Sequence, residues 1–433
     1  MSARRLLIIT YYFPPSPSIG GARWAAMSEW LRRLGHEVTV LTTKAGGPSD
    51  DDGGWVLRTA DVSAMASVRK LLRRPPARSA EAAQSIQKPP PRWFTDIVVP
   101  DEYLFTWGLP ALASVRRAIR EREIDCVITS GPPQSTHLLP LLLGARRPAW
   151  IADFRDGWRF EPLRPPWPMR AQDRLDGALE RRVARSADVV IGVTRPIATD
   201  TKERLTASSA YIPNGWDPDF DRRLEGVAAP PLDPSYVNVV HTGKLSGPRG
   251  RDPQPLFAAM RQLAANRPAV ASRLRLTFAG RLDTEDERLL CKFDLRSVKH
   301  VGSLSRAAAL ALQREADVLL LLTSSTHISE ATGKLFEYLA AGRPILALAN
   351  GNEAARIVGE TGAGIVVHPH DVDGIEQALA AAVDGALTAS YAPHGLTRYI
   401  YPRPAEEVAD LVERAIAQRA CSDDEAQIVR RVL

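Results

Sequence analysis

A lysine and a glutamate, Lys334 and Glu337, stand three residues apart in a segment, 333–341, that is otherwise apolar and predicted to be a helix. A lysine in the first helical turn is disfavoured by roughly a few tenths of a kcal/mol, and an anion bound at the free N–H groups reverses that penalty. A carboxylate on a mostly buried helix needs hydrogen-bond donors. The two residues therefore indicate an anion site followed by a carboxylate with ligand-binding capacity. An ion pair between Lys334 and Glu337 on a solvated face is the alternative.

Two apolar runs flank this helix and position it. Residues 317–322 and 344–348 are typical of buried strands. Thr332 is placed to cap the helix, and Gly342 is placed to end it in a left-handed conformation. A strand, a loop, a helix and a second strand make one crossover of a parallel sheet. The polar loop then lies at the carboxyl end of a strand, where open α/β sheets bind ligands.

The stretch 333–344, Gly-Lys-Leu-Phe-Glu-Tyr-Leu-Ala-Ala-Gly-Arg-Pro, resembles the donor-site signature of retaining GT-B glycosyltransferases of family four. The resemblance implies that Glu337 binds the ribose hydroxyls of a nucleotide sugar while the helix start holds the diphosphate. It implies donor-binding roles for Thr332, Gly333, Lys334 and Leu335. The family carries an earlier glutamate eight positions before the second. Ser329 occupies that position here, and Glu330, one place later, is a candidate catalytic residue.

A second basic loop follows the predicted strand 237–240, which ends in His-Thr-Gly-Lys. By the resemblance, Gly243 binds the donor, and Lys244 and Arg251 are the two cations that act on its diphosphate, with Arg249 as the alternative to Arg251. Cations can stabilise a leaving diphosphate by themselves. We therefore expect no metal and no cofactor besides the nucleotide-sugar co-substrate.

Two further features belong to the same half of the chain. Gly302 follows the predicted strand 299–301, where family members contact the base through backbone groups. The D-x-D at 371–373 precedes a predicted helix, 373–383, and is interpreted as a helix cap rather than a metal site.

The first half opens with a predicted strand, 6–10, and a Pro-rich loop after which Gly20 and Gly21 begin a helix. There is no G-x-G-x-x-G, and no acidic residue ends the next strand, 37–41, so a dinucleotide site is disfavoured. Glycines still let a phosphate or sugar approach the backbone. The resemblance places this loop against the acceptor and the donor phosphate; a tight structural turn is the alternative. Further strands are predicted over 125–129, 149–152 and 187–193.

Two polar loops follow the strands 125–129 and 149–152. Their segments Ser-Gly-Pro-Pro, at 130–133, and Asp-Phe-Arg-Asp, at 153–156, resemble those of a subset of family-four enzymes that build bacterial cell-surface glycans. Many family members have a histidine at the end of the first strand, where this chain has Ser130; His137 is therefore a candidate catalytic residue, and a buried structural histidine is the alternative. Asp156 is the candidate on the acceptor side, while Asp153 and Arg155 are close enough in sequence to pair with each other.

The chain has 433 residues, of which 45% are hydrophobic and 24% charged, an ordinary globular composition with room for two or three domains. The strand pattern and the resemblance predict an α/β fold of the GT-B type, with two facing Rossmann-like domains and a cleft between them. The expected parts are an acceptor-side domain at 1–205, a hinge at 206–235, a nucleotide-sugar-binding domain at 236–398, and a helix returning to the first domain with a tail at 399–433.

The net charge of +6 favours anionic partners, and the absence of a nucleic-acid-binding motif puts nucleic acid last among them. The three cysteines lie far apart and form no C-x-x-C, so they indicate neither a disulfide framework nor a zinc site and favour a reducing cytoplasmic location. The basic and apolar run 69–74 and the aromatics between Trp93 and Trp107 predict reversible association with the inner face of an anionic membrane and a lipid-linked acceptor. A solvated insertion followed by core aromatics is the alternative.

The predicted activity is transfer of a sugar from a nucleotide sugar to an acceptor hydroxyl, with retention, in cell-surface polysaccharide or glycolipid biosynthesis. Two alternatives stay open. A nucleotide-sugar epimerase on the same fold requires acid and base residues beside the sugar. A non-catalytic nucleotide-sugar-binding partner protein is favoured by Ser329 in place of the first glutamate.

Overall fold

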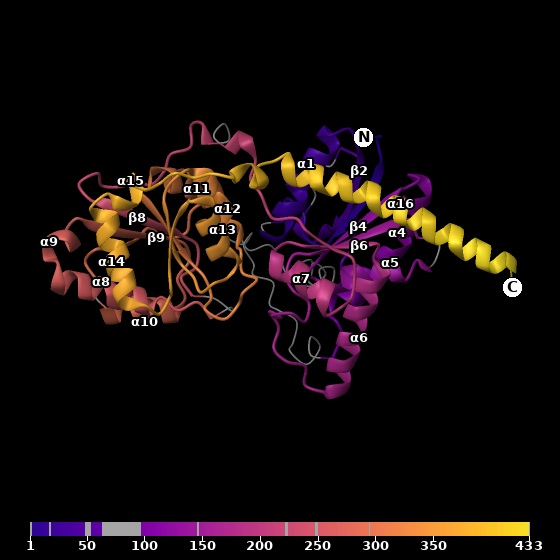
Figure 1. The fold of residues 1–433 in the computed structure, drawn as a ribbon, viewed down its shortest axis with the longest axis horizontal. Coiled ribbons are helices and arrows are strands. Elements are labelled where there is room, and N and C mark those ends of the chain that lie inside the picture. Colours follow the sequence, from indigo (N-terminus) through magenta and orange to yellow (C-terminus); the bar gives the residue numbers. More distant parts are fainter. Residues whose placement is uncertain are drawn as a thin grey trace, which may run out of the picture. The chain divides into compact units, whose positions relative to one another are not determined.

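The computed structural model describes residues 2–16, 19–47, 53–62, 97–144, 147–220, 224–246, 250–293 and 295–432. The chain forms two compact units, each described here by itself (Figure 1). The first unit is Met1–Pro213 together with Pro404–Leu433, and the second is Asn214–Arg403.

The first unit is built on a seven-stranded parallel sheet with the order β3-β2-β1-β4-β5-β6-β7. Its strands are β1 (Arg5–Thr10), β2 (Glu37–Thr43), β3 (Val56–Thr59), β4 (Cys126–Gly131), β5 (Ala149–Phe154), β6 (Val189–Gly192) and β7 (Ser209–Tyr211). The central strands are continuous runs of buried residues, as expected for a parallel sheet covered on both faces. The edge strand β7 falls inside the range 206–235 that was expected to be a hinge.

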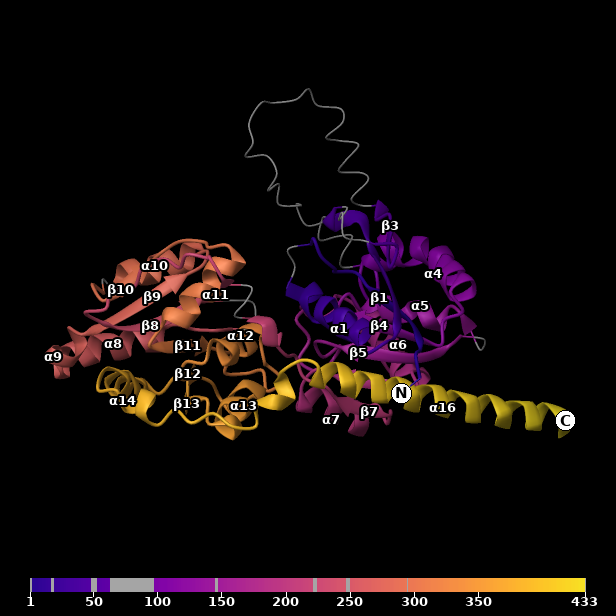
Figure 2. The ribbon, with the colours of Figure 1, turned by 90° about the horizontal axis from the view of Figure 1, so that it is seen from above.

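The helices of this unit are α1 (Ala22–Arg33), α4 (Leu109–Glu121), α5 (Leu138–Leu141), α6 (Arg170–Ser186), α7 (Arg195–Glu203) and α16 (Arg403–Val432). Buried side chains of α4, α5 and α6 pack against one face of the sheet. The last helix, α16, runs along the first unit in both ribbon views (Figures 1 and 2). An ion pair of 2.6 Å between Arg4 and Glu413 fastens it beside β1.

The second unit contains a six-stranded parallel sheet with the order β10-β9-β8-β11-β12-β13. Its strands are β8 (Val237–Thr242), β9 (Leu274–Ala279), β10 (Val298–His300), β11 (Val318–Leu322), β12 (Ile345–Leu348) and β13 (Gly364–Val367). Its helices are α8 (Gln254–Asn266), α9 (Pro268–Ala271), α10 (Thr284–Phe293), α11 (Arg306–Glu315), α12 (Gly333–Ala341), α13 (Glu353–Thr361), α14 (Val372–Val383) and α15 (Ala386–Ala389).

Helices cover both faces of this second sheet. Side chains of α8 and α14 form the core on one face, and side chains of α11, α12 and α13 form the core on the other. The predicted α/β class with two Rossmann-like units is confirmed. Because the strands are parallel, the loops after β8 and β11 leave the sheet at one edge, and this edge positions the candidate donor residues.

Candidate active site

Helix α12 begins at Gly333 without a side-chain cap. Thr332 has the extended backbone of an N-cap residue, as predicted, but its side chain makes no capping bond and its enclosed Oγ1 has no hydrogen-bond partner. Gly342 ends the helix in the left-handed conformation, at φ 68°, also as predicted. The first turn therefore presents backbone N–H groups, with the positive end of the helix dipole, to whatever binds there.

The side chain of Lys334 lies across Gly243, in the loop after β8. A Cβ atom placed on Gly243 would be 2.1 Å from Lys334 Nζ, and the φ of +107° at Gly243 is one that other residues rarely adopt. The glycine is therefore required for the lysine to lie where it does. Burial and, to a smaller extent, the nearby Arg251 lower the pKa of Lys334 to about 8. An anion beside Lys334 would oppose both effects.

Glu330 and Arg251 lie beside this lysine. The Glu330 carboxylate is fully buried and accepts a hydrogen bond of 2.6 Å from the backbone N–H of Ser324. Its other oxygen has no hydrogen-bond partner and lies 3.9 Å from Arg251 Nε, which is also enclosed and unpartnered. Glu330 thus acts on both cations: it faces Arg251, and together with Glu337 it favours the charged form of Lys334.

The remaining predicted donor residues occupy different environments. Lys244 is exposed, so its ammonium group is accessible to a ligand. Gly302 has a φ of +76° and its carbonyl accepts a bond of 2.8 Å from the N–H of Gly280, at the edge of the sheet. The side chain of Leu335 is fully buried in the core, so only its backbone can contact a donor.

Glu337 pairs with a residue on another helix. Its carboxylate lies 3.3 Å from the guanidinium of Arg306, at the start of α11, and its side chain is 27% exposed. It forms no ion pair with Lys334, so the alternative explanation by a local pair on one helix is wrong. The side chain of Arg306 is 71% exposed, and a pair this open to water is weak and exchangeable.

Sequence reasoning missed a buried network beneath Gly243. The hydroxyl of Tyr338 accepts a bond of 3.0 Å from the N–H of Thr242, and the Gln313 side-chain amide donates to Thr242 Oγ1 at 2.9 Å. These bonds fix the end of β8 to α12 and α11. A tyrosine on the buried face of an apolar helix was the available signal, because its hydroxyl needs a partner there.

In the first unit, the turn before α1 is built by close approach. A Cβ on Gly21 would be 3.1 Å from backbone atoms of Tyr12 and Phe13, and one on Gly20 would be 2.5 Å from a guanidinium nitrogen of Arg155. Both glycines therefore meet a steric requirement of the turn. The role of Gly20 and Gly21 toward acceptor or phosphate stays a prediction.

Asp153 pairs with Arg23 on α1 and not with Arg155. Its fully buried carboxylate lies 3.2 Å from the Arg23 guanidinium and accepts bonds from Trp24 Nε1 at 2.6 Å and Ser130 Oγ at 2.8 Å. The expected Asp153–Arg155 pair is wrong because β5 ends at Phe154 and the chain turns there.

Arg155 instead joins two loops of the same edge. Its guanidinium donates to the carbonyl oxygens of Gly20, Gly131 and Pro132, and burial lowers its pKa. Asp156, the acceptor-side candidate, is half-buried in the loop that follows.

His137 is enclosed by the core of the first unit. Its Nδ1 is 2.8 Å from Thr129 Oγ1, and its ring lies against Phe154 and is stacked on Trp158, with centroids 5.0 and 6.3 Å away. Burial lowers its pKa to about 3, so the ring is neutral at physiological pH. No part of the side chain reaches the surface, and a contact with an acceptor would require the surrounding loop to open.

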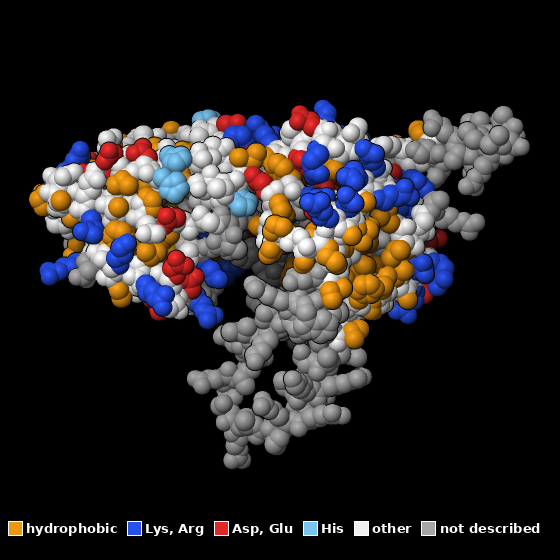
Figure 3. Space-filling view, turned by 90° about the horizontal axis from the view of Figure 1, so that it is seen from below, with side chains coloured by type: hydrophobic (Ala, Val, Ile, Leu, Met, Phe, Trp, Pro, Cys, Tyr) orange, Lys and Arg blue, Asp and Glu red, His pale blue; other side chains and the backbone are white. Residues whose placement is uncertain are grey.

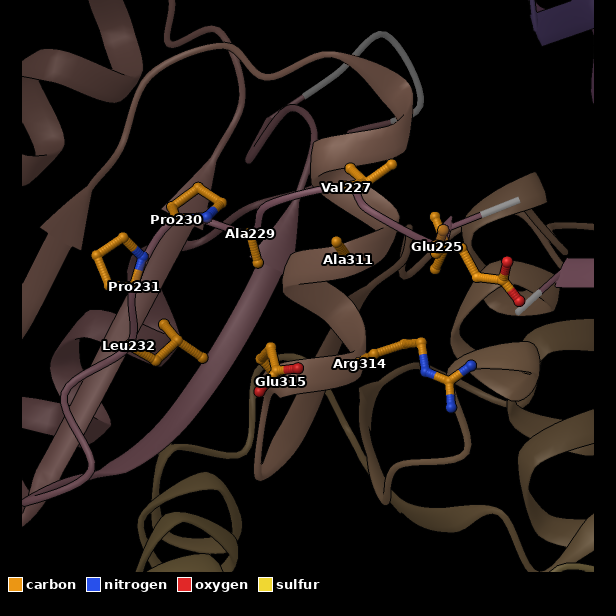
Figure 4. A pocket seen from close by; sticks show the side chains of 10 residues that line it. Glu225, Val227, Ala229, Pro230, Pro231, Leu232, Ala311, Arg314 and Glu315 are labelled. Carbon is orange, nitrogen blue, oxygen red and sulfur yellow. The ribbon is translucent and has the colours of Figure 1, made fainter. Parts of the chain in front are cut away.

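A groove of about 650 Å³ lies elsewhere in the second unit. The segment 224–232 and helix α11 form its walls, with Pro230, Pro231 and Leu232 facing Ala311 and Glu315 (Figure 4). None of the predicted site residues lines it. Within the described ranges, no three His, Cys, Asp or Glu side chains are grouped as a metal site would need.

The predicted membrane-facing segment is described only in part. Residues 69–74, Trp93 and Phe94 lie outside the described residues. Trp107 is fully buried and donates to Thr59 Oγ1 at 2.8 Å, whereas Phe105 is 54% exposed. Figure 3 shows hydrophobic and basic side chains side by side on one face of the first unit. In the part of the chain that the structure describes, no helix is both long and apolar enough to cross a bilayer.

Comparisons with known proteins cover both halves of the chain. Residues 20–215 match the glycosyl transferase 4-like domain, and residues 237–385 match the glycosyl transferases group 1 domain. A search of curated proteins finds no significant match.

Three solved structures show the same fold at low identity. Sucrose-phosphate synthase from Thermosynechococcus elongatus is 16% identical over 99% of both chains, with a TM-score of 0.55. WaaG, a glycosyltransferase involved in lipopolysaccharide biosynthesis, is 15% identical over 95% of this chain and 98% of its own, with a TM-score of 0.53. The UDP-GlcNAc 2-epimerase from Methanocaldococcus jannaschii is 10% identical over 94% and 99%, with a TM-score of 0.51. The two domain matches and the two-sheet architecture together show that this chain belongs to the glycosyltransferases of the GT-B fold.

Proposed function

We propose that this glycosyltransferase moves a sugar from a nucleotide-sugar donor to an acceptor hydroxyl, with retention of configuration and without a bound metal. The observation that carries the proposal is the cluster at the carboxyl edge of the second sheet. There an uncapped helix start lies beside two largely buried cations, Lys334 and Arg251, and beside the buried carboxylate of Glu330. Such a cluster is matched to a diphosphate, which is anionic and accepts several hydrogen bonds.

Each donor-side residue then has a defined task. The N–H groups at the start of α12 hold the diphosphate, and Lys334, Arg251 and Lys244 stabilise the charge that develops as it leaves. Glu337 exchanges its exposed partner Arg306 for the ribose hydroxyls. The bond between the anomeric carbon and the phosphate oxygen breaks, the acceptor oxygen bonds to the same face of that carbon, and the acceptor proton passes to the leaving phosphate.

The test is binding of nucleotide sugars to Glu337→Gln. UDP-glucose, UDP-N-acetylglucosamine and GDP-mannose, each in turn, should raise the melting temperature of the wild-type enzyme if one is the donor. Loss of charge-assisted bonds to two hydroxyls costs roughly 2–3 kcal/mol, so Glu337→Gln should weaken binding of that donor by about thirty- to a hundredfold. Glu360→Gln, which makes the same change at an ion-paired glutamate on the neighbouring helix α13, is the matched control. Equal donor affinity in wild type and Glu337→Gln would show that Glu337 does not bind the donor.

The acceptor belongs to the proposal as well. The similarity to WaaG in fold and the basic segment 69–74 support an acceptor on a cell-surface polysaccharide or glycolipid, presented at an anionic membrane. Epimerisation is the second candidate, because the Methanocaldococcus jannaschii epimerase has the same fold. Incubation with a nucleotide sugar and no acceptor distinguishes epimerisation from transfer. An epimerase releases an isomeric sugar, whereas a transferase leaves the donor sugar unchanged apart from slow hydrolysis.

A further inference from the structure

His241 makes two contacts that a neutral imidazole cannot both satisfy. It is the penultimate residue of β8 and is fully buried. Its Nδ1 lies 2.9 Å from the carbonyl oxygen of Leu320 on β11, and its Nε2 lies 3.1 Å from the carbonyl oxygen of Lys244. A carbonyl oxygen only accepts, and neutral imidazole has one N–H. One contact therefore places a ring lone pair against a carbonyl oxygen, and only the imidazolium can donate to both.

The surroundings of His241 keep it neutral while no anion is bound. Burial, together with the two charged groups that act on it, lowers its pKa to about 3; these groups are Lys334 from α12 and Arg251 from the loop after β8. The element on its other side, β9, contributes the uncharged ring of Phe278 at 6.0 Å. The carbonyl oxygens of Leu320 and Lys244 favour the charged form but do not outweigh burial and the two cations.

On the basis of the donor site proposed above, we propose that His241 is a positioning residue that takes up a proton when the diphosphate binds. The two cations that oppose its charge, Lys334 and Arg251, are the groups that a diphosphate would neutralise, and the bound anion would itself favour an imidazolium. The proton comes from solvent and forms the second ring N–H. Both carbonyl contacts then become charge-assisted hydrogen bonds.

The consequence is mechanical as well as electrostatic. When both ring nitrogens donate, His241 links the loop after β8 to the strand β11 by hydrogen bonds to the carbonyl oxygens of Lys244 and Leu320. The turn at Gly243, on which Lys334 rests, is thereby fixed when the donor is present. Because binding takes up a proton, donor affinity rises as the pH falls.

The experiment is titration calorimetry at pH 6 in two buffers with different ionisation enthalpies, using the nucleotide sugar identified by thermal shift. At this pH Lys334, with its pKa of about 8, is already protonated before the donor binds. The diphosphate diester of a nucleotide sugar does not titrate there either. A buffer-dependent binding enthalpy in the direction of proton uptake is expected for wild type, together with affinity that weakens from pH 5.5 to pH 7.5.

Two variants assign the proton. His241→Asn keeps one donor group and cannot titrate, so its binding enthalpy should be independent of buffer. His327→Asn removes a half-buried histidine from the loop after β11 and should leave the uptake intact. Should His241→Asn fail to fold, nitrogen NMR of wild type labelled in histidine shows directly whether one ring nitrogen becomes protonated on addition of donor.

The outcomes separate the two proposals. Donor binding without proton uptake, or uptake that persists in His241→Asn, overturns the role of His241 and leaves the donor site standing. Failure of every nucleotide sugar to bind overturns the donor site and the role of His241 with it.

Discussion

Replacing Asp153 with Asn should destabilise the first unit severely. Asp153 is fully buried, and the side chain of its partner Arg23 is only 4% exposed. Arg23 also donates to the carbonyl oxygens of Ile212 and Pro213 at 3.0 and 2.7 Å, so it cannot leave the interior to find water without breaking those bonds. Asp153→Asn removes the carboxylate that lies 3.2 Å from this buried cation.

Two losses add in this variant. An uncompensated charge left by one half of a buried pair costs about 3–5 kcal/mol. The amide nitrogen of Asn accepts no hydrogen bond: at one position it faces the Trp24 N–H and the Ser130 hydroxyl, which approach the same oxygen of Asp153 at 2.6 and 2.8 Å, and at the other position it faces the Arg23 guanidinium. We therefore expect a loss of at least about 3 kcal/mol in the free energy of unfolding, a large share of the roughly 5–15 kcal/mol typical of a domain.

The assay is denaturant unfolding followed by tryptophan fluorescence. Of the nine tryptophans, only Trp216 lies in the second unit, so the signal reports mainly on the first. The matched control is Glu29→Gln on α1, whose pair with Arg33 has both side chains more than 40% exposed and should contribute less than about 1 kcal/mol. The double variant Arg23→Gln with Asp153→Asn should lose less than the sum of the single variants, because the second change removes the uncompensated charge. If Asp153→Asn unfolds at the same denaturant concentration as Glu29→Gln, the buried pair does not hold this unit together.

Two further predictions concern turnover and location. Lys244→Ala and Arg251→Ala should each lower the turnover number by on the order of a hundredfold while raising the Michaelis constant for the donor much less, since these charges act mainly on the leaving diphosphate; unchanged turnover in both would contradict the metal-free mechanism. The enzyme should sediment with vesicles containing anionic lipid, be released by salt and ignore neutral vesicles, because each basic residue near an anionic surface contributes about 1 kcal/mol. Changing Arg69, Lys70, Arg73 and Arg74 together to Ser should abolish sedimentation and keep donor binding, and vesicle binding that survives this change would favour a soluble acceptor.

Local chemistry made part of this structure predictable. The limits of α12 follow from Thr332 and Gly342, and β13 spans the predicted residues 364–367, because caps and apolar runs act over a few neighbours. The capping role predicted for this D-x-D is confirmed for Asp371, which accepts a bond from the N–H of Gly374 at 2.9 Å. The strand β7, with three half-buried residues, has no apolar run to mark it and was missed.

The charge partners could not be read from the sequence. Asp153 finds Arg23, which is 130 positions away, and Glu337 finds Arg306, 31 positions away, while the nearer candidates Arg155 and Lys334 are used elsewhere. Sequence spacing ranks partners along one element, but the end of β5 at Phe154 and the direction of Lys334 across Gly243 are set by packing. His241 was missed for the same reason, because the two carbonyl oxygens that contact its ring are brought there only by the folded sheet.

The two units differ in how far their buried charged groups are hydrogen-bonded. This difference indicates which unit a bound ligand would stabilise more. In the first unit, Asp153 is satisfied by Arg23, and Arg155 is held by three carbonyl oxygens, so the loops at its edge are fixed in advance. In the second unit, Glu330 and Arg251 face each other at 3.9 Å with unpartnered atoms, and His241 holds one lone pair against a carbonyl oxygen. Such groups destabilise the unliganded state, and an anion that neutralises the cations removes the cost. The donor should therefore stabilise the second unit far more than any acceptor stabilises the first.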